Sequence, residues 1–363
     1  MSAVEAPSDG RGPIVTVVGA RPQFVKAAVV SRALAARGLD ERIVHTGQHY
    51  DHDMSGRLLA QLGIERVDAN LSVGSGGHSH QTARIMAGLD DYIASLDAHP
   101  AAVLVYGDTN STLAAALVAA KRHLPLVHVE AGLRSGDRAM PEEVNRVVTD
   151  SLADVLLCSS SVGVARLAEE GRHENVHDVG DVMLDAFRHF MPIARQRAAL
   201  PDDLGAADDP LVVATVHRPS NTDDPAALDA IIEAFGRLGH RVVWPVHPRL
   251  QGALEGRTLP PNVLTLPPLG YLEMLALLDR AVAVLTDSGG LQKEAHWART
   301  PCTTLRDTTE WTETLEGGWN VLCDPRREDV PALALRTPKG PWRRLYGDGK
   351  ASERIAAIMA ERL

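Results

Sequence analysis

The chain has 363 residues, of which 45% are hydrophobic, 23% charged and 4% aromatic, and its formal net charge at pH 7 is −10. This composition is that of a globular protein, which excludes disordered and fibrous proteins, and the length predicts two domains. Acidic residues outnumber basic ones, and the sequence has no basic stripe of the kind that binds duplex DNA. We therefore expect no nucleic-acid partner.

The cysteines and the apolar stretches exclude further classes of protein. Cys158, Cys302 and Cys323 are far apart and form no CxxC pair, which indicates neither a disulfide framework nor a zinc site. The polar N-terminal stretch 1–12 has no apolar segment of the secretory kind, and the apolar stretch 113–120 is too short to cross a bilayer. We therefore expect a cytoplasmic protein that does not bind membranes.

Short apolar strands alternate with amphipathic helices from residue 13 onwards, which is typical of a parallel sheet with helical crossovers. In the first half of the chain, the pattern predicts helices at residues 23–37, 111–123 and 142–152. It predicts strands at residues 14–19, 41–47, 101–109, 124–132, 153–160 and 175–181.

A second series of the same kind follows the stretch 198–210, whose Ala, Asp, Gly and Pro residues predict a linker. Its helices are expected at 225–238, with Asp224 as N-cap, and at 272–278. Its strands are expected at residues 211–217, 241–247, 262–267, 281–288 and 301–306. We therefore predict two doubly wound, Rossmann-like α/β domains facing a cleft, residues 1–195 and 196–345, with a last helix in 346–363 that can pack on the first.

Two cations follow the first predicted strand. No dinucleotide or P-loop fingerprint follows any strand. Instead, Arg21 and Lys26 lie near the start of the first helix, where cations are unfavourable unless an anion offsets them. We expect both side chains to bind an anion such as a phosphate group.

Carboxylates collect at the ends of the next strands. Asp108 follows one strand, Glu130 ends the next, and Glu142 opens a helix on which Asn145 and Arg146 share its face. In one sheet these acids would converge on the same edge, as proton removal and return at a carbon atom require.

The second half carries a cation pair and a glycine pair, each after a strand. His217 and Arg218 end the first strand there, where phosphate contact is plausible. Ser288 is a natural N-cap, and Gly289 and Gly290 would let a phosphate approach the backbone closely. Glu294 follows in the helix, placed to accept hydrogen bonds from a ribose diol.

The histidines near residue 50 do not predict a metal site. His45, His49 and His52 lie in a strand-to-loop segment without regular ligand spacing. We expect a polar loop there, and no metal in the protein.

These segments, taken together and in order, resemble the non-hydrolysing UDP-N-acetylglucosamine 2-epimerase family. The resemblance covers residues 14–323 and rests on GARPQFVK, HTGQHYD, VYGDTNSTLA, HVEAGLRSGD, MPEEVNR, VGDVMLDA, HRPSNTDDP, PVHPR, LTDSGGLQKEA and LRDTTEWTET. The C-terminal LYGDGKASERI resembles the branch of the family that acts on UDP-2,3-diacetamido-glucuronic acid.

The resemblance implies a glycosyltransferase-B fold, a homodimer, no metal or redox cofactor, and a UDP-sugar as substrate. It assigns catalytic positions to Arg21, Lys26, Asp108, Glu130, Glu142 and His217, with Arg146 and Arg218 in support. It assigns UDP contacts to Arg21, Lys26, His217, Met274, Ser288, Gly289, Gly290 and Glu294.

The chemistry of the expected reaction agrees with the residues. Carbon 2 of a sugar is not next to a carbonyl, so inversion there needs either oxidation at C3 or expulsion of the anomeric diphosphate. Without a dinucleotide fingerprint, elimination of UDP to 2-acetamidoglucal and re-addition is the route expected. We therefore expect interconversion of UDP-N-acetylglucosamine and UDP-N-acetylmannosamine. The alternatives are a 2-epimerase of UDP-2,3-diacetamido-glucuronic acid, a hydrolysing epimerase, a retaining glycosyltransferase of the same architecture, and a non-catalytic nucleotide-sugar sensor.

Overall fold

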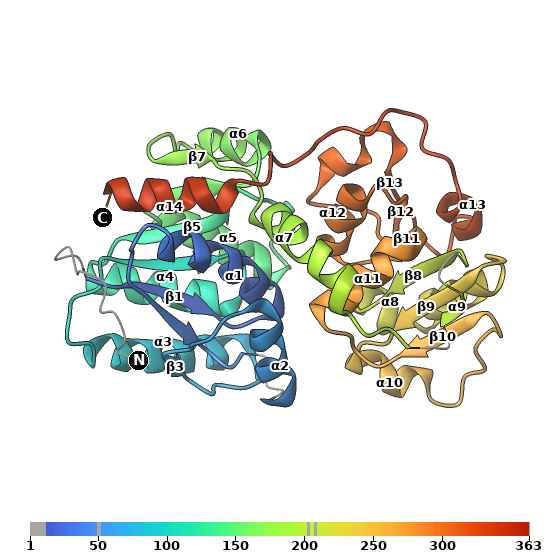
Figure 1. Cartoon of the computed structure of the whole chain (residues 1–363), viewed down its shortest axis with the longest axis horizontal. Helices are drawn as coiled ribbons and strands as arrows, with labels where there is room; N and C mark the ends of the chain where they lie inside the picture. Colours follow the sequence, from blue (N-terminus) through green and yellow to red (C-terminus); the bar gives the residue numbers. More distant parts are fainter. Residues whose placement is uncertain (1–11, 49–51, 202–203, 207–208, 363) are drawn as a thin grey trace. The chain divides into compact units, whose positions relative to one another are not determined.

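The computed structural model describes residues 12–48, 52–201, 204–206 and 209–362, which fall into two compact units (Figure 1). Unit 1 contains the chain up to Ala186 together with Tyr346–Leu363, and unit 2 contains Phe187–Leu345. His49 and most of the polar N-terminal stretch lie outside the described residues. No helix within the described ranges is long and apolar enough to cross a membrane.

Unit 1 is built on a parallel sheet, seven-stranded over the described residues, in the order β3-β2-β1-β4-β5-β6-β7. The strands are β1 (Ile14–Val18), β2 (Glu41–His45), β3 (Ala69–Asn70), β4 (Ala102–Tyr106), β5 (Leu126–Ala131), β6 (Val155–Cys158) and β7 (Val176–Asp178). The chain adds strands first on one side of β1 and then on the other, so the order reverses between β1 and β4. Sheets of this kind bind ligands at such a reversal, beyond the carboxyl ends of the strands.

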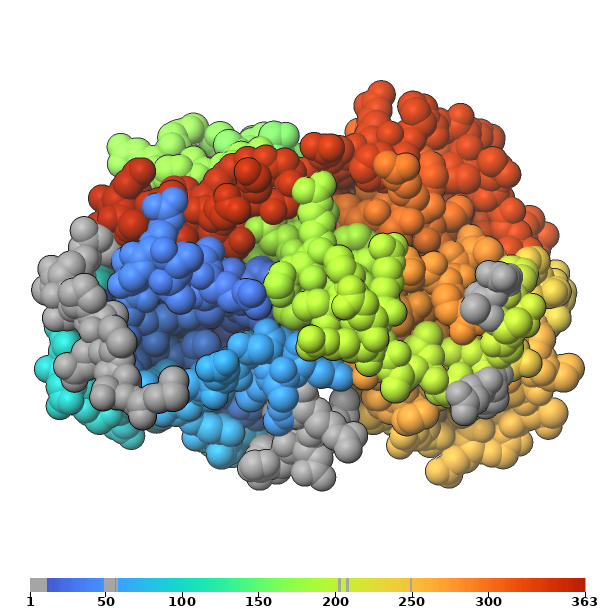
Figure 2. Space-filling model, viewed as in Figure 1, coloured from blue at the N-terminus to red at the C-terminus, as the bar shows by residue number. Residues whose placement is uncertain are grey.

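Helices cover both faces of this sheet, which is why its central strands β1 and β4 are buried throughout. They are α1 (Arg21–Ala35), α2 (His52–Leu62), α3 (His78–Ala94), α4 (Asn110–Arg122), α5 (Pro141–Leu152), α6 (Ser161–Glu169) and α14 (Ala351–Arg362). Val15 and Val17 of β1 pack with Val105 of β4 and with apolar residues of α3 and α4. On another side of the unit, α14 packs along α1, and Figure 2 shows the red residues of α14 beside the blue residues of α1.

Unit 2 repeats the architecture with a parallel sheet, six-stranded over the described residues, in the order β10-β9-β8-β11-β12-β13. Its strands are β8 (Leu211–Thr215), β9 (Arg241–Pro245), β10 (Val263–Leu266), β11 (Ala281–Thr286), β12 (Cys302–Thr304) and β13 (Asn320–Leu322). Its helices are α8 (Pro219–Thr222), α9 (Pro225–Gly236), α10 (Pro248–Leu254), α11 (Tyr271–Arg280), α12 (Gly289–Ala298), the 3₁₀ helix η2 (Thr312–Gly318) and α13 (Val330–Ala334). Here the strand order reverses between β8 and β11.

The core of unit 2 is filled by apolar side chains from its sheet and from α9. Trp244 of β9 is fully buried and meets Phe235 of α9 edge to face, with ring centroids 5.2 Å apart. The predicted N-cap of α9 is confirmed, because the Asp224 side chain accepts a hydrogen bond of 3.0 Å from the backbone N–H of Ala226.

The chain passes between the units twice, inside α7 (Val182–Arg197) and before Tyr346, and Asp185 joins the two passages on the unit 1 side. Its carboxylate accepts the backbone N–H groups of Ala351 (3.1 Å) and Ser352 (2.7 Å) and the Ser352 hydroxyl (2.6 Å). The N–H of Asp181 also donates to the carbonyl of Tyr346 at 2.9 Å. Asp185 therefore satisfies the first N–H groups of α14 and fixes this helix in unit 1.

The expected fold class, two doubly wound α/β units, is confirmed. The domain boundary expected after residue 195 and the division after Ala186 both fall within α7. The sequence pattern does not predict β3, whose two residues are too few to show a period, and it does not predict β13.

Candidate active site

Two of the acids singled out from the sequence follow neighbouring strands of unit 1. Asp108 comes two residues after β4, and Glu130 lies near the end of β5. The parallel register pairs Tyr106 with Val129, so both acids reach the same edge of the sheet. This edge is next to the reversal of strand order between β1 and β4, where a ligand site is expected.

Glu130 has an unusual backbone and a buried cationic partner. Its φ is +74°, and the register of β5 against β6 shifts between Val129 and Ala131, so a bulge re-aims its side chain. Lys26 of α1, only 7% exposed, donates to the Glu130 carboxylate. Gly107 leaves room for this pair, because a Cβ there would lie 3.2 Å from Glu130 Oε2.

Asp108 is bound from α5. Arg146 Nη2 donates to Asp108 Oδ2 at 2.5 Å, and the Asn145 amide donates to the Asp108 carbonyl at 2.9 Å. Loss of hydration raises the pKa of Asp108, the charge of Glu130 raises it too, and the charges of Arg146 and Lys26 offset this only in part. The pKa of this carboxyl therefore lies above its ordinary value, as suits a group that exchanges protons.

The two adjacent glutamates at the start of α5 face different surroundings. Glu142 is exposed, whereas Glu143 is buried and accepts the N–H groups of Ser135 (2.8 Å) and Gly136 (3.0 Å). Burial alone would raise the pKa of Glu143, but these hydrogen bonds and one of 3.1 Å from Arg146 lower it. Glu143 therefore holds the 135–136 loop, while Glu142 stays open to solvent in this unit.

The turn from β1 into α1 is held by a residue that sequence reasoning missed. Gln23 Oε1 accepts the N–H groups of Gly19 (2.8 Å) and Ala20 (3.0 Å), and its amide donates to the carbonyl of Tyr106 at 2.7 Å. Arg21 is the first residue of α1, at the expected helix N-terminus, and it is partly exposed. Gln23 thus ties the strand end that carries Arg21 to the strand end that carries Asp108.

In unit 2, the partly exposed His217 contacts a fully buried aspartate. His217 Nδ1 lies 2.9 Å from Asp287 Oδ1, and Asp287 also accepts the N–H of Arg218 (2.9 Å) and the amide of Asn221 (3.0 Å). Burial would raise the pKa of Asp287, but the contacts of His217, Arg218 and Asn221 outweigh it and lower the pKa. The ionised Asp287 orients the His217 ring, and the centroid of this ring lies 5.8 Å from that of His247.

The two glycines at the start of α12, Gly289 and Gly290, have different surroundings. A Cβ at Gly289 would lie 2.7 Å from Glu310 Oε1 and 3.1 Å from Trp311 Nε1, whereas a Cβ at Gly290 meets nothing within 4 Å. Glu310 pairs with Arg306 at 3.0 Å. The Glu310 carboxylate therefore occupies the space that a side chain at position 289 would need. Of these two glycines, only Gly290 has open space next to its Cα.

The other predicted residues of unit 2 lie on its last helices. Ser288 is the N-cap of α12, as expected, but its side chain makes no capping hydrogen bond. Glu294 is buried in α12, and Met274 is partly buried in α11. The structure thus brings Ser288, Gly289 and Gly290 to the carboxyl end of β11, beside the strand end of His217.

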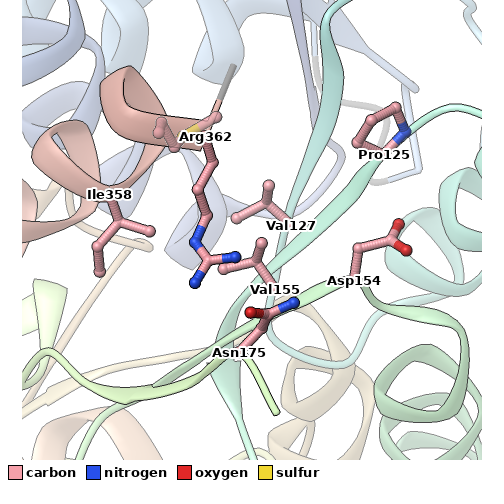
Figure 3. A pocket seen from close by; sticks show the side chains of 8 residues that line it. Pro125, Val127, Asp154, Val155, Asn175, Ile358 and Arg362 are labelled. Carbon is pink, nitrogen blue, oxygen red and sulfur yellow. The ribbon is translucent and has the colours of Figure 1, made fainter.

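A small cavity in unit 1 lies away from these residues. It is lined by Val127 at the start of β5, Val155 at the start of β6, Asn175 before β7 and Arg362 of α14 (Figure 3). These residues mark the amino-terminal edge of the sheet, opposite to Asp108 and Glu130. In the part of the chain that the structure describes, no group of three His, Cys, Asp or Glu side chains could hold a metal ion.

The chain matches a known protein family over most of its length. The family model described as UDP-N-acetylglucosamine 2-epimerase matches residues 32–360. The chain belongs to this family. The expected enzyme class, an epimerase and hence an isomerase, is confirmed.

Individual relatives of this epimerase agree over almost its whole length. It is 46% identical to the UDP-2,3-diacetamido-2,3-dideoxy-D-glucuronate 2-epimerase of Pseudomonas aeruginosa, with 96% of this chain and 99% of that protein covered. The crystal structure of Methanocaldococcus jannaschii UDP-GlcNAc 2-epimerase in complex with UDP-GlcNAc and UDP is 34% identical, with a TM-score of 0.88 over 96% of this chain and 99% of that one. The glycosyltransferase SnogD from Streptomyces nogalater, 17% identical with a TM-score of 0.54 over 97% and 96%, shares the fold alone.

Proposed function

We propose that this epimerase inverts C2 of a UDP-2-acetamido sugar and interconverts UDP-N-acetylglucosamine and UDP-N-acetylmannosamine. The observation that carries the proposal is the pair of carboxylates, Asp108 and Glu130, each bound to a cation at one edge of the sheet in unit 1. The M. jannaschii relative, described in complex with UDP-GlcNAc and UDP, supports a UDP-sugar as the substrate.

The reaction proceeds by elimination and re-addition. A carboxylate takes the proton from C2, the C1–O bond to the diphosphate breaks, and the electron pair of the C2–H bond forms a C1=C2 double bond. The products are 2-acetamidoglucal and UDP. The UDP oxygen then adds back to C1 while a proton reaches C2 from the opposite face.

The residues divide into two sets. In unit 1, the raised pKa of Asp108 supports a role in proton transfer, together with Glu130 and Glu142, while Arg146 holds Asp108. Arg21 and Lys26 counter the charge that develops on the leaving UDP. In unit 2, the diphosphate and uridine are bound by His217, Arg218, Met274, Ser288, Gly289, Gly290 and Glu294.

Incubation with UDP-N-acetylglucosamine in deuterated water tests the proposal by NMR. Deuterium should appear at C2 of a UDP-linked manno product. Asp108→Asn, Glu130→Gln and Glu142→Gln should each lose about 10²-fold or more in exchange rate. Glu169→Gln, an exposed residue of α6, is the control and should exchange like the unmodified protein. Absence of exchange in a folded sample, with every UDP-2-acetamido sugar supplied, would refute C2 epimerisation.

A second substrate has its own support. The 46% identity to the P. aeruginosa protein favours UDP-2,3-diacetamido-2,3-dideoxy-D-glucuronate, whose sugar carries an additional carboxylate and an additional acetamido group. Measuring kcat/KM for both UDP-sugars under the same conditions decides between them. A ratio above about 100 in favour of the diacetamido sugar would assign the chain to that branch.

The homodimer, the cytoplasmic location and a role in amino sugar biosynthesis are part of the proposal and rest on the family resemblance. Light scattering of the purified protein tests the first. A mass of one chain across the working concentration range would refute the dimer.

A further inference from the structure

His128 is a fully buried histidine of β5 whose two ring nitrogens both face hydrogen-bond acceptors. Nδ1 lies 2.7 Å from Asp150 Oδ1, and Nε2 lies 2.7 Å from the backbone carbonyl of Gly107. The His128 ring therefore joins α5 to the chain that leads into Asp108.

The partner carboxylate is held in its ionised form. The second oxygen of Asp150 accepts the N–H of Gly132 (3.1 Å) and Nη1 of Arg134 (2.7 Å). Burial alone would raise the pKa of Asp150, but the charges and hydrogen bonds of His128 and Arg134 lower it. Arg134 in turn binds both oxygens of Glu170 at 2.8 and 2.7 Å, so no charge in this cluster lacks a partner.

This cluster links every segment of unit 1 that carries a candidate acid. Gly107, which accepts from His128, directly precedes Asp108. His128 precedes Glu130 by two residues in β5. Asp150 lies in α5, one turn after Arg146, the residue that binds Asp108.

We propose that His128 and Asp150 are a positioning pair for the epimerisation, an inference that rests on the function proposed above. The His128 ring fixes the Gly107 carbonyl and so sets the direction of the chain at Asp108, which follows directly. Asp150 fixes the same ring from α5 and the chain at Gly132, just beyond the bulge of Glu130. Neither residue touches the sugar; together they fix the separation and direction of the two acids.

Two amide substitutions separate the contacts. The amide nitrogen of Gln reaches the place of Nε2, so His128→Gln keeps the bond to Gly107, whereas the shorter Asn reaches only toward Asp150. His128→Asn should lower kcat for C2 exchange by about 100-fold, the scale of a misplacement of about 1 Å, with a much smaller change in KM. His128→Gln should restore at least tenfold of that loss.

Three outcomes decide the proposal. Equal kcat values in His128→Asn and His128→Gln, or a loss confined to thermal stability in both, would overturn it. If neither variant folds, Asp150→Asn replaces them: it removes the charge that binds the His128 ring from α5 and should also lower kcat for C2 exchange. An unchanged kcat in this variant overturns the proposal. If the unmodified protein exchanges C2 of no sugar supplied, the proposed function is refuted, and the positioning role with it.

Discussion

Arg146 reaches from α5 to the end of β4, where its Nη2 lies 2.5 Å from Oδ2 of Asp108. The contact sets a cation against a carboxyl whose pKa is nevertheless raised, because lost hydration and the charge of Glu130 act in the opposite direction. Asp108 is thus held in place by the same group that limits its basicity.

Removing the charge of Arg146 should move the acidic limb of the pH profile for C2 exchange to higher pH. Arg146 lowers the pKa of Asp108, so Arg146→Gln raises this pKa further, and the base becomes protonated at a higher pH. Arg146→Lys keeps the charge and should shift the limb less. An unchanged limb in Arg146→Gln would show that the ionisation of Asp108 does not govern the rate.

Glu130→Gly should be more stable than Glu130→Ala, although both should lose C2 exchange. Both variants leave Lys26 without a side-chain acceptor at position 130, so they differ mainly in the backbone, where a φ of +74° is strained for any residue with a Cβ. We expect a difference of about 1 kcal/mol in the free energy of unfolding, measured by denaturant titration. The opposite order of stability would mean that the positive φ at position 130 does not destabilise the protein.

Gly289→Ala and Gly290→Ala should differ sharply in stability. A methyl group at position 289 collides with Glu310 and Trp311, which predicts a loss of about 1–3 kcal/mol. At position 290 the space is open, and alanine is favoured over glycine in a helix by up to about 1 kcal/mol. Calorimetric UDP titration of the stable Gly290→Ala variant then measures how closely the phosphate approaches there. Equal stability of the two variants would contradict the assigned packing.

Asp185→Ala should destabilise unit 1 by about 2 kcal/mol, the upper range for the loss of a helix N-cap. The variant removes three hydrogen bonds to the start of α14 and leaves two backbone N–H groups buried. Glu361→Ala, at an exposed position in the last turn of α14, should change the stability little. Hydrogen exchange of α14 should rise in the first variant alone; equal exchange in both would refute the role of Asp185.

The edge that carries the acids could be predicted from the sequence, because parallel strands of similar length bring their carboxyl ends together. Asp108 and Glu130 directly follow apolar runs, and this was enough to place them. The pairing of Lys26 with Glu130 could not be predicted, because it depends on a bulge and a positive φ at Glu130 that a glutamate does not signal.

Other features depended on packing that no local pattern records. Glu142 and Glu143 are neighbours in sequence, and only the 135–136 loop decides which of them is buried. The pairing of Asp287 with His217 had a usable signal, since both end strands on either side of a reversal in strand order. The role of Gly289 had none, because Glu310 and Trp311 arrive from a later loop.

In the sequence, unit 2 is inserted into unit 1. Asp185, just before the insertion, accepts hydrogen bonds from Ala351 and Ser352, which follow it and are synthesised much later. During synthesis, residues 187–345 leave the ribosome as one continuous stretch, whereas unit 1 must wait for α14 to cover α1. Domains generally fold as units and N-terminal first. Here the order of completion is reversed: a released chain that ends at residue 345 should carry a protease-resistant unit 2 and an unfinished unit 1.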